Sequence, residues 1–250
     1  TAWPAGLALA AGRYQPIGFI KRPATLNPPL TVDQAEMLEA VSERMATESG
    51  LAWREIGDDI DAITLCLNTG TRIRTGEEAR DVIATTDRVG RLGPRGSGSR
   101  WAWTGQIIGS SPQALYRAMC ALFLTVEDAF VFDGYDATEP WVTYSGTQAG
   151  DLLRSAGITP QIHSEPRNTV GHWLALSARP LNAGLILINS HGNASVLNFP
   201  GGQVRGADVP LLGKPAMAHV VHSFSLQNPP NRATVGGALL DRGVYALLGS

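Results

Sequence analysis

A regular alternation of apolar runs and helical patterns between residues 128 and 250 constrains the fold of this chain more than any other feature. The apolar runs, each typical of a buried strand, cover residues 128–134, 159–165, 183–190, 216–223 and 244–250. The helical patterns between them cover residues 147–157, 168–180 and 233–243. Strands that are apolar on both faces and alternate with helices are typical of a parallel sheet covered on both sides. The alternation therefore predicts a three-layer α/β/α sandwich with a mainly parallel sheet.

The N-terminal half of the chain predicts an accessory α/β region over residues 1–126, followed by a second domain over residues 127–250. The elements expected in the first region are helices that begin at Thr31 and Thr75 and strands at residues 61–68 and 101–108. The segment 93–100 is rich in Gly, Ser and Arg, which makes it the best candidate for a linker. In the second region a Gly/Pro-rich excursion from 191 to 215 predicts a small hairpin or lid.

The composition excludes several classes of protein. The 250 residues carry a net charge of −2 with interspersed signs, so we expect no nucleic-acid partner. Two cysteines cannot build a disulfide framework, and the chain has no CxxC or HExxH pattern, so we expect no metal site and no cofactor. No segment reaches the roughly 18 apolar residues of a membrane span, so we expect no membrane partner. These features predict a soluble protein, cytoplasmic rather than exported.

Polar residues follow the apolar runs at the ends where the strands of a parallel sheet converge. Ligands of such sheets bind beyond the carboxyl ends of the strands, because the connecting loops meet there. The candidate site residues at these ends are Asp133, Tyr135, Asn189, His191, Gly192, Asn193, Ser223, Phe224 and Ser225. The sequence therefore predicts its site at this edge of the sheet.

Two blocks of the second region resemble the caspase-like cysteine peptidases, the group of caspases, gingipains, clostripain and the bacterial CHAT domains. The block "LILINSHGN" (185–193) resembles the apolar strand of these peptidases that ends in Ser-His-Gly. The block "VVHSFSLQNPPNRATVGGALLDRGVYALLGS" (220–250) resembles their next core strand, nucleophile loop, helix and following strand. The resemblance covers residues 128–250 and implies a caspase-like sandwich. Since caspase-like domains usually continue beyond this strand, we expect the domain to be truncated at its C-terminus.

The resemblance assigns roles to some residues and departs from the family at the nucleophile. It implies that His191 matches the catalytic histidine and that Gly192 matches the glycine whose N–H helps to bind the oxyanion. Phe224 stands at the position that best matches the nucleophilic cysteine, with Ser223 and Ser225 on either side. Asp133, at a neighbouring strand end, is a candidate group to orient the histidine.

Cys66 and Cys120 lie far along the sequence from this loop, so the expected nucleophile is missing. The leading interpretation is a caspase/CHAT-like domain without its catalytic cysteine that binds a peptide or protein partner, or acts as a scaffold. One alternative is a hydrolase that uses Ser225 or Ser223 with His191. A second alternative is a doubly wound domain that binds a small ligand and shares only the architecture. The sequence does not indicate an oligomeric state.

Overall fold

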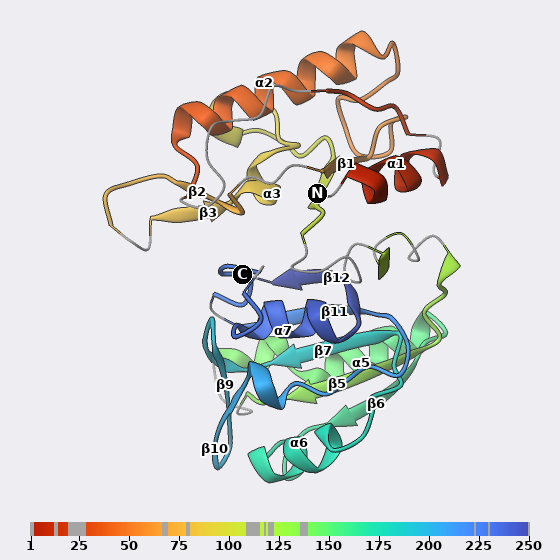
Figure 1. Ribbon diagram of the computed structural model, residues 1–250, viewed down its shortest axis with the longest axis vertical. Coiled ribbons are helices and arrows are strands. Elements are labelled where there is room, and N and C mark those ends of the chain that lie inside the picture. Colours follow the sequence, from red (N-terminus) through yellow and green to blue (C-terminus); the bar gives the residue numbers. More distant parts are fainter. Residues whose placement is uncertain are drawn as a thin grey trace. The chain divides into compact units, whose positions relative to one another are not determined.

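The chain folds into two compact units, Thr1–Ile108 and Gly109–Ser250, as described by a computed structural model (Figure 1). The structure describes residues 3–12, 15–19, 29–66, 70–78, 81–108, 116–117, 119, 123–135, 140–222, 224–229 and 231–249. Each unit has its own buried apolar residues, and each is described by itself below. The domain boundary expected after residue 126 stays a prediction.

A five-stranded parallel sheet forms the centre of unit 2. Its strands are β5 (Asp128–Asp133), β6 (Thr159–His163), β7 (Leu185–Asn189), β11 (Ala216–Val221) and β12 (Val244–Gly249), in the order β12-β11-β7-β5-β6. Every neighbouring pair in this sheet is parallel. The mixed α/β class with a parallel sheet is therefore confirmed, and each strand falls within an apolar run that the sequence indicated.

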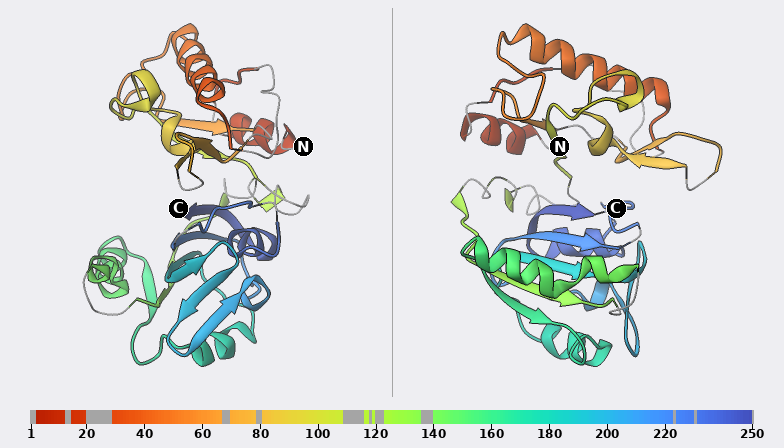
Figure 2. Two further views of the ribbon diagram at one scale, coloured as in Figure 1. Left: turned by 90° about the vertical axis from the view of Figure 1, so that its left-hand side faces the viewer. Right: turned by 180° about the vertical axis from the view of Figure 1, so that it is seen from behind.

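Helices cover both faces of this sheet (Figure 2). The helices are α5 (Gly146–Ser155), α6 (Val170–Ser177) and α7 (Val235–Arg242), with short 3-10 turns η3 (Trp141–Tyr144) and η4 (Gly206–Asp208). Helix α5 lies on the face of Val131 and Ile162, because Gly146 and Gly150 approach these two side chains. Helices α6 and α7 cover the opposite face, where Trp173 and Val235 join the same core cluster.

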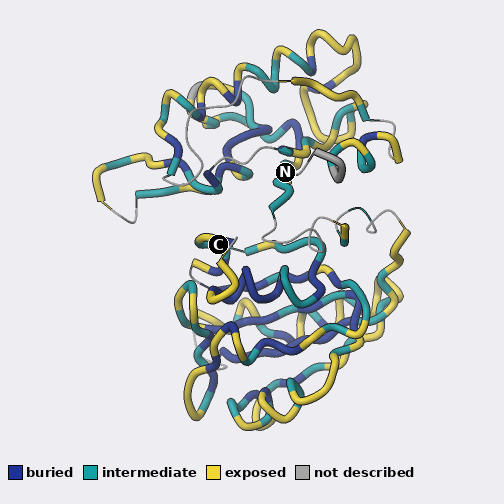
Figure 3. Tube along the Cα trace, viewed as in Figure 1, coloured by how far each residue is buried: buried dark blue, intermediate teal, exposed yellow. Residues whose placement is uncertain are grey.

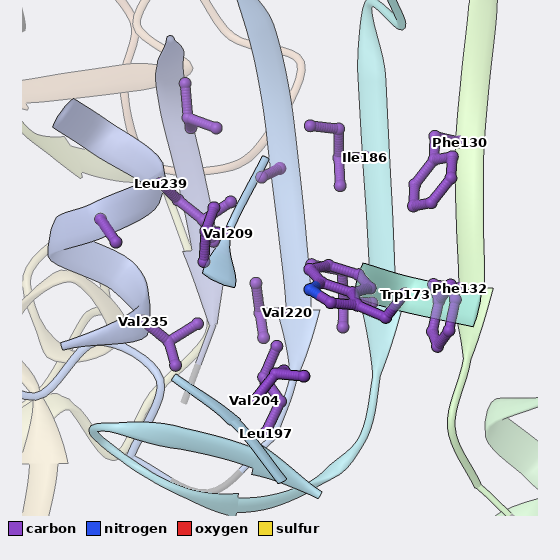
Figure 4. Packing of buried hydrophobic residues seen from close by; sticks show 14 of the residues in the cluster. Phe130, Phe132, Trp173, Ile186, Leu197, Val204, Val209, Val220, Val235 and Leu239 are labelled. Atoms are coloured by element: carbon purple, nitrogen blue, oxygen red, sulfur yellow. The ribbon is translucent and has the colours of Figure 1, made fainter. Parts of the chain in front are cut away.

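The main core of unit 2 lies between the sheet and helices α6 and α7. Trp173 of α6 packs edge-on against Phe132, with ring centroids 5.0 Å apart, and its indole N–H donates to the carbonyl oxygen of Asp208 over 2.8 Å. Ile186 and Val220 are labelled beside it in Figure 4. The central strands of the sheet carry many of the buried residues of the unit, as the tube in Figure 3 shows. This core holds the strand ends in a fixed register.

A small antiparallel sheet occupies the excursion between β7 and β11, as the sequence predicted for residues 191–215. It consists of β8 (His191–Asn193), β9 (Val196–Phe199) and β10 (Gly202–Arg205), in the order β10-β9-β8. Leu197 and Val204 point from it into the main core. The first α7 amide, that of Val235, donates to the carbonyl oxygen of Ala194 at the hairpin turn over 2.8 Å. The hairpin is therefore tied both to the core and to the start of α7.

Unit 1 combines one long helix with several short elements. They are α1 (Trp3–Gly12), α2 (Val32–Glu48), β1 (Ala62–Leu65), β2 (Arg72–Arg74), β3 (Val82–Ala84), α3 (Thr85–Arg88), the 3-10 turn η1 (Pro94–Gly96) and β4 (Trp103–Gln106). Strand β1 pairs with β4 in parallel, and β2 pairs with β3 antiparallel. Thr31 caps α2 with a capping box that Gln34 completes, which confirms the predicted helix start.

The helix predicted from Thr75 onwards is wrong. The amide of Thr75 donates to the carbonyl oxygen of Asp81, and the chain continues as β3, so the segment forms a hairpin before the short α3. Val82 and Ile83 are β-branched and favour a strand, which the acidic residues after Thr75 concealed in the sequence. The candidate linker at 93–100 lies within unit 1, where Gly98 donates to the carbonyl oxygen of Leu92 over 2.7 Å.

Candidate functional site

The parallel register brings the carboxyl ends of β5, β7 and β11 together at one edge of the sheet. Asp133 pairs with Asn189, and Asn189 pairs with Val221, so these residues form one row across three strands. The segments that follow the row carry the residues that the sequence singled out. The structure therefore brings most of the predicted site residues to one place.

Asp133 and Asn189 hold the segment that leads into α5. The amide of Gly146 donates to the Asp133 Oδ2 over 2.6 Å, and the Asn189 side-chain amide donates to the carbonyl oxygen of Tyr144. The amide of Tyr135 donates to the other carboxylate oxygen of Asp133 over 3.4 Å. The carboxylate is buried and engaged with backbone amides, so its described contacts position a loop rather than orient His191.

Four aromatic and imidazole rings, those of Tyr135, Trp141, Tyr144 and His191, form what we call the edge cluster. Tyr135 and Trp141 stack with their ring centroids 5.1 Å apart. The His191 ring lies edge-on to both, at 4.8 Å from each centroid. Tyr144 adds a fourth ring 6.2 Å from Tyr135. Trp141 and Tyr144 keep 36% and 48% of their surface exposed, and His191 is exposed too, so the cluster presents an open aromatic surface.

The hydroxyl group of Tyr135 ties this cluster to the end of β11. It donates to the carbonyl oxygen of Val221 over 2.9 Å, and the same oxygen accepts from the amide of Ser190 over 3.1 Å. Burial is the largest cause that raises the pKa of Tyr135, followed by the nearby Tyr144 and Asp133. The phenol therefore stays protonated at neutral pH and remains a hydrogen-bond donor.

Gly192 lies in a part of β8 where only glycine fits. Its φ of +148° belongs to the region that side chains avoid, and an added Cβ would approach the Val196 carbonyl oxygen to 2.1 Å. The buried ring of His222 lies directly below, and its Nε2 is 2.6 Å from the carbonyl oxygen of Asn193. Since a carbonyl only accepts, Nε2 carries the proton. Burial, followed by the proximity of His191, lowers the pKa of His222 to about 4.

In the loop after β11, the side chain of Phe224 is exposed and that of Ser225 is buried. Phe224 is 44% exposed and has a φ of +63°, whereas Ser225 is 1% exposed. The Ser225 hydroxyl donates to the carbonyl oxygen of Val220 over 3.4 Å, and an added Cβ on Gly249 would lie 2.1 Å from this hydroxyl oxygen. Ser225 therefore faces β11 and β12, on the side away from β7. Ser223 lies outside the described residues.

Neither cysteine of the sequence belongs to the loop after β11. Cys66 belongs to unit 1, where burial raises the pKa of its thiol, so the reactive thiolate is disfavoured there. Cys120 lies outside the described residues. Within the described residues, no three His, Cys, Asp or Glu side chains gather in a way that could hold a metal ion.

Two features of this edge were missed from the sequence. The first is the pair of rings Trp141 and Tyr144, which no sequence pattern singles out and which precede Ser145, the residue that caps α5. The second feature is a contact between two histidines. The Nδ1 of His163, at the end of β6, lies 2.9 Å from the Nε2 of His172 in α6. Burial is the main cause that lowers the pKa of His163 to about 4, with smaller effects of His172 and Arg167.

The exposed imidazole of His191 contacts the rings of Tyr135 and Trp141. Comparisons of the chain with protein-family models, with curated proteins and with solved structures found no match. Among the helices that the structure describes, none combines the length and the apolar character needed to cross a membrane.

Proposed function

We propose that the second region of this chain is a caspase/CHAT-like domain without a nucleophile that binds an extended peptide of a partner protein at the edge cluster. The observation that carries this proposal is the position of His191, whose ring lies edge-on to both Tyr135 and Trp141. A general base would need a nucleophile within hydrogen-bond reach. Here the same imidazole is part of an exposed aromatic surface.

The position of Ser225 argues against the serine hydrolase. Its side chain is almost fully buried, and its hydroxyl donates to the carbonyl oxygen of Val220. A nucleophilic hydroxyl would have to reach both the base and the substrate. The peptide-binding function needs neither, because exposed rings and backbone groups are sufficient to hold an extended chain.

The composition of the edge favours an uncharged part of the ligand. The described residues of segments 140–146, 189–193 and 224–227 contain no Lys, Arg, Asp or Glu. Asp133 is buried, and its carboxylate oxygens accept from two backbone amides. Trp141 and Tyr144 offer flat apolar surface with polar atoms at the rim, as residues that dominate recognition surfaces commonly do.

Peptide binding can be tested by panning random linear peptides against the full chain and measuring the affinity of the enriched sequences by fluorescence anisotropy. We expect Trp141→Ala to weaken binding by about tenfold or more, as for a central aromatic contact. Trp103→Ala is the matched control, because Trp103 is a 63% exposed tryptophan of unit 1. Equal affinities of the two variants, or no enriched peptide at all, would contradict the proposal.

Catalysis and family membership are tested separately. A fluorophosphonate probe should not label the wild-type chain, and labelling that disappears in Ser225→Ala would instead establish the hydrolase. A Phe224→Cys variant should gain reactivity toward a thiol probe, and this reactivity should depend on His191, if the loop matches the nucleophile loop of caspase-like peptidases. An inert thiol in a folded variant would remove the support for that family.

A further inference from the structure

We propose that Phe224 is a recognition residue that the loop after β11 holds outward to contact an apolar or aromatic side chain of the bound peptide. This inference rests on the proposed function and names the part of the site that selects the ligand. Three observations carry it: the conformation of the turn, the burial of its neighbours and the position of the turn beside the edge cluster.

Buried residues anchor the turn on both sides of Phe224. His222 is buried against the hairpin and bonded to Asn193, and Ser225 is buried against β11 and β12. The amide of Ser225 donates to the carbonyl oxygen of His222 over 3.3 Å, and the amide of Gln227 donates to that of Phe224 over 3.0 Å. The exposed aromatic side chain therefore stands between two fixed points of the backbone.

Two glycines of neighbouring elements let the loop lie this close to the sheet. An added Cβ on Gly236 of α7 would approach the Ser225 carbonyl oxygen to 2.4 Å, and one on Gly249 of β12 would approach the Ser225 hydroxyl to 2.1 Å. Both approaches are shorter than any real contact of a Cβ atom. The packing around Ser225 is therefore tight.

The backbone of Phe224 is strained. A φ of +63° lies in the left-handed region, which bulky residues rarely adopt and which glycine adopts freely. Glycine or asparagine would be the residue for a turn whose only task is to reverse the chain. An exposed phenylalanine in this conformation reduces stability, and strained residues of this kind are concentrated at functional sites. The backbone conformation alone therefore does not account for phenylalanine at this position, and we attribute its presence to the aromatic ring.

The strained turn follows β11, and the last residue of β11 is bonded to the edge cluster. The carbonyl oxygen of Val221, three residues before Phe224, accepts from the hydroxyl group of Tyr135. A peptide on the cluster would therefore run past the end of β11, where the Phe224 ring is exposed. Because the described residues on either side of Phe224 are uncharged, the peptide side chain that meets the ring is expected to be apolar or aromatic.

Two variants that lack the aromatic ring separate the contribution of the ring to binding from the cost of the left-handed backbone at position 224. Phe224→Gly and Phe224→Ala both remove the aromatic contact, but only glycine suits the left-handed conformation. We expect the glycine variant to melt about 2–4 °C above the alanine variant. The matched control is Leu152, 72% exposed on α5, where Gly should melt below Ala because the position is helical.

Binding is measured on the full chain by NMR titration with blocked tripeptides that place Phe, Leu, Glu or Lys between two alanines. We expect the Phe and Leu peptides to shift the amide signals of residues 191–193 and 224–227 in the wild type. Both Phe224 variants should weaken this binding by about fivefold, and both Leu152 variants should leave it unchanged.

Each other outcome overturns a defined part of this reasoning. If Gly is not more stable than Ala at position 224, the strained turn is absent. If both Phe224 variants bind as the wild type does while Trp141→Ala does not, the role of Phe224 is wrong and the proposed function survives. If no tripeptide binds and panning fails, the proposed function itself is wrong. Self-association of the wild type that the variants lose would identify a second copy as the occupant.

Discussion

Unit 1 and unit 2 reach a stable interior by different means. Unit 2 packs two helices against a five-stranded sheet around one continuous apolar cluster. The described residues of unit 1 form two sheets of two strands each and two smaller apolar clusters. Unit 1 also buries an ion pair, in which the Arg88 guanidinium bonds both carboxylate oxygens of Glu39 and joins α3 to α2.

The two interiors differ in the unfavourable features that they can accept. A large apolar core supplies stabilisation that is spread over many contacts, so unit 2 can carry buried histidines and a strained turn at one edge. Unit 1 depends more on a few specific bonds. We therefore expect single polar substitutions to matter most in unit 1, and pH and backbone substitutions to matter most in unit 2.

The largest expected effect comes from breaking the buried ion pair of unit 1. Glu39→Leu leaves the Arg88 guanidinium buried without its bidentate partner, and we expect unit 1 to lose about 3–5 kcal/mol of its unfolding free energy. Hydrogen exchange of α2, followed by mass spectrometry, measures this loss separately from unit 2. The double variant Glu39→Leu/Arg88→Met should recover most of it, because no charge then remains buried.

An exposed ion pair of unit 2 serves as the control for this prediction. On the surface of α5, the Arg154 Nη1 lies 2.7 Å from the Asp151 Oδ1, and both side chains are exposed. Asp151→Ala should change stability by no more than about 0.5 kcal/mol. If Glu39→Leu is equally mild, unit 1 does not depend on its buried pair and the contrast between the two units fails.

Acid should destabilise unit 2, through two buried histidines. The pKa values of His163 and His222 are lowered to about 4, mainly by burial. An unfolded histidine titrates near 6.5, so between these values the unfolded state binds more protons than the folded state. The associated stability is fully present above pH 6.5 and is lost as the pH falls toward 4. We expect a loss on the order of 2 kcal/mol for each histidine.

Denaturant unfolding at a series of pH values measures this loss. The variant His222→Gln shows how much of the loss is due to His222. Glutamine does not titrate and can still donate to the carbonyl oxygen of Asn193, so the variant should show a shallower decline between pH 6.5 and 4. A decline as steep as that of the wild type would mean that His222 does not titrate in this range.

Two glycines of unit 2 should respond to the same substitution with opposite signs. Gly192→Ala should cost about 1–3 kcal/mol, because the added Cβ would meet the Val196 carbonyl oxygen at a strained φ. Gly171→Ala in α6 should instead stabilise the unit by up to about 1 kcal/mol, since its Cβ would meet nothing within 4 Å. Thermal unfolding of both variants measures the pair, and the same sign for both would contradict the strain at Gly192.

The sequence predicted the sheet of unit 2 better than the elements of unit 1. Runs such as the one that became β7 are apolar on both faces, and a buried parallel strand is the simplest structure that accounts for them. In unit 1 the strands β2 and β3 are three residues each, too short to produce a clear period. Acidic residues after Thr75 then favoured a helix, and the antiparallel pairing of β2 with β3 overrode that preference.

The sequence was sufficient to predict which edge of the sheet carries the candidate site, but not how the side chains of the site are arranged. Polar residues after apolar strands indicated the edge, and the structure brings Asp133, Asn189 and His191 to it. The rings that surround His191 come from a loop whose path no local pattern encodes. The burial of Ser225 depends on the left-handed turn at Phe224, and a phenylalanine gives no sign of such a turn.

One oxygen atom at this edge joins three strands. The carbonyl of Val221 receives the amide of Ser190, which follows β7, and the phenol of Tyr135, which follows β5. A carbonyl oxygen has two lone pairs, and both are in use here. Any ligand that turned the Tyr135 ring would break one of these bonds and loosen the backbone that leads to Phe224. Ligand binding at the edge cluster and the conformation of the turn at Phe224 would then be coupled.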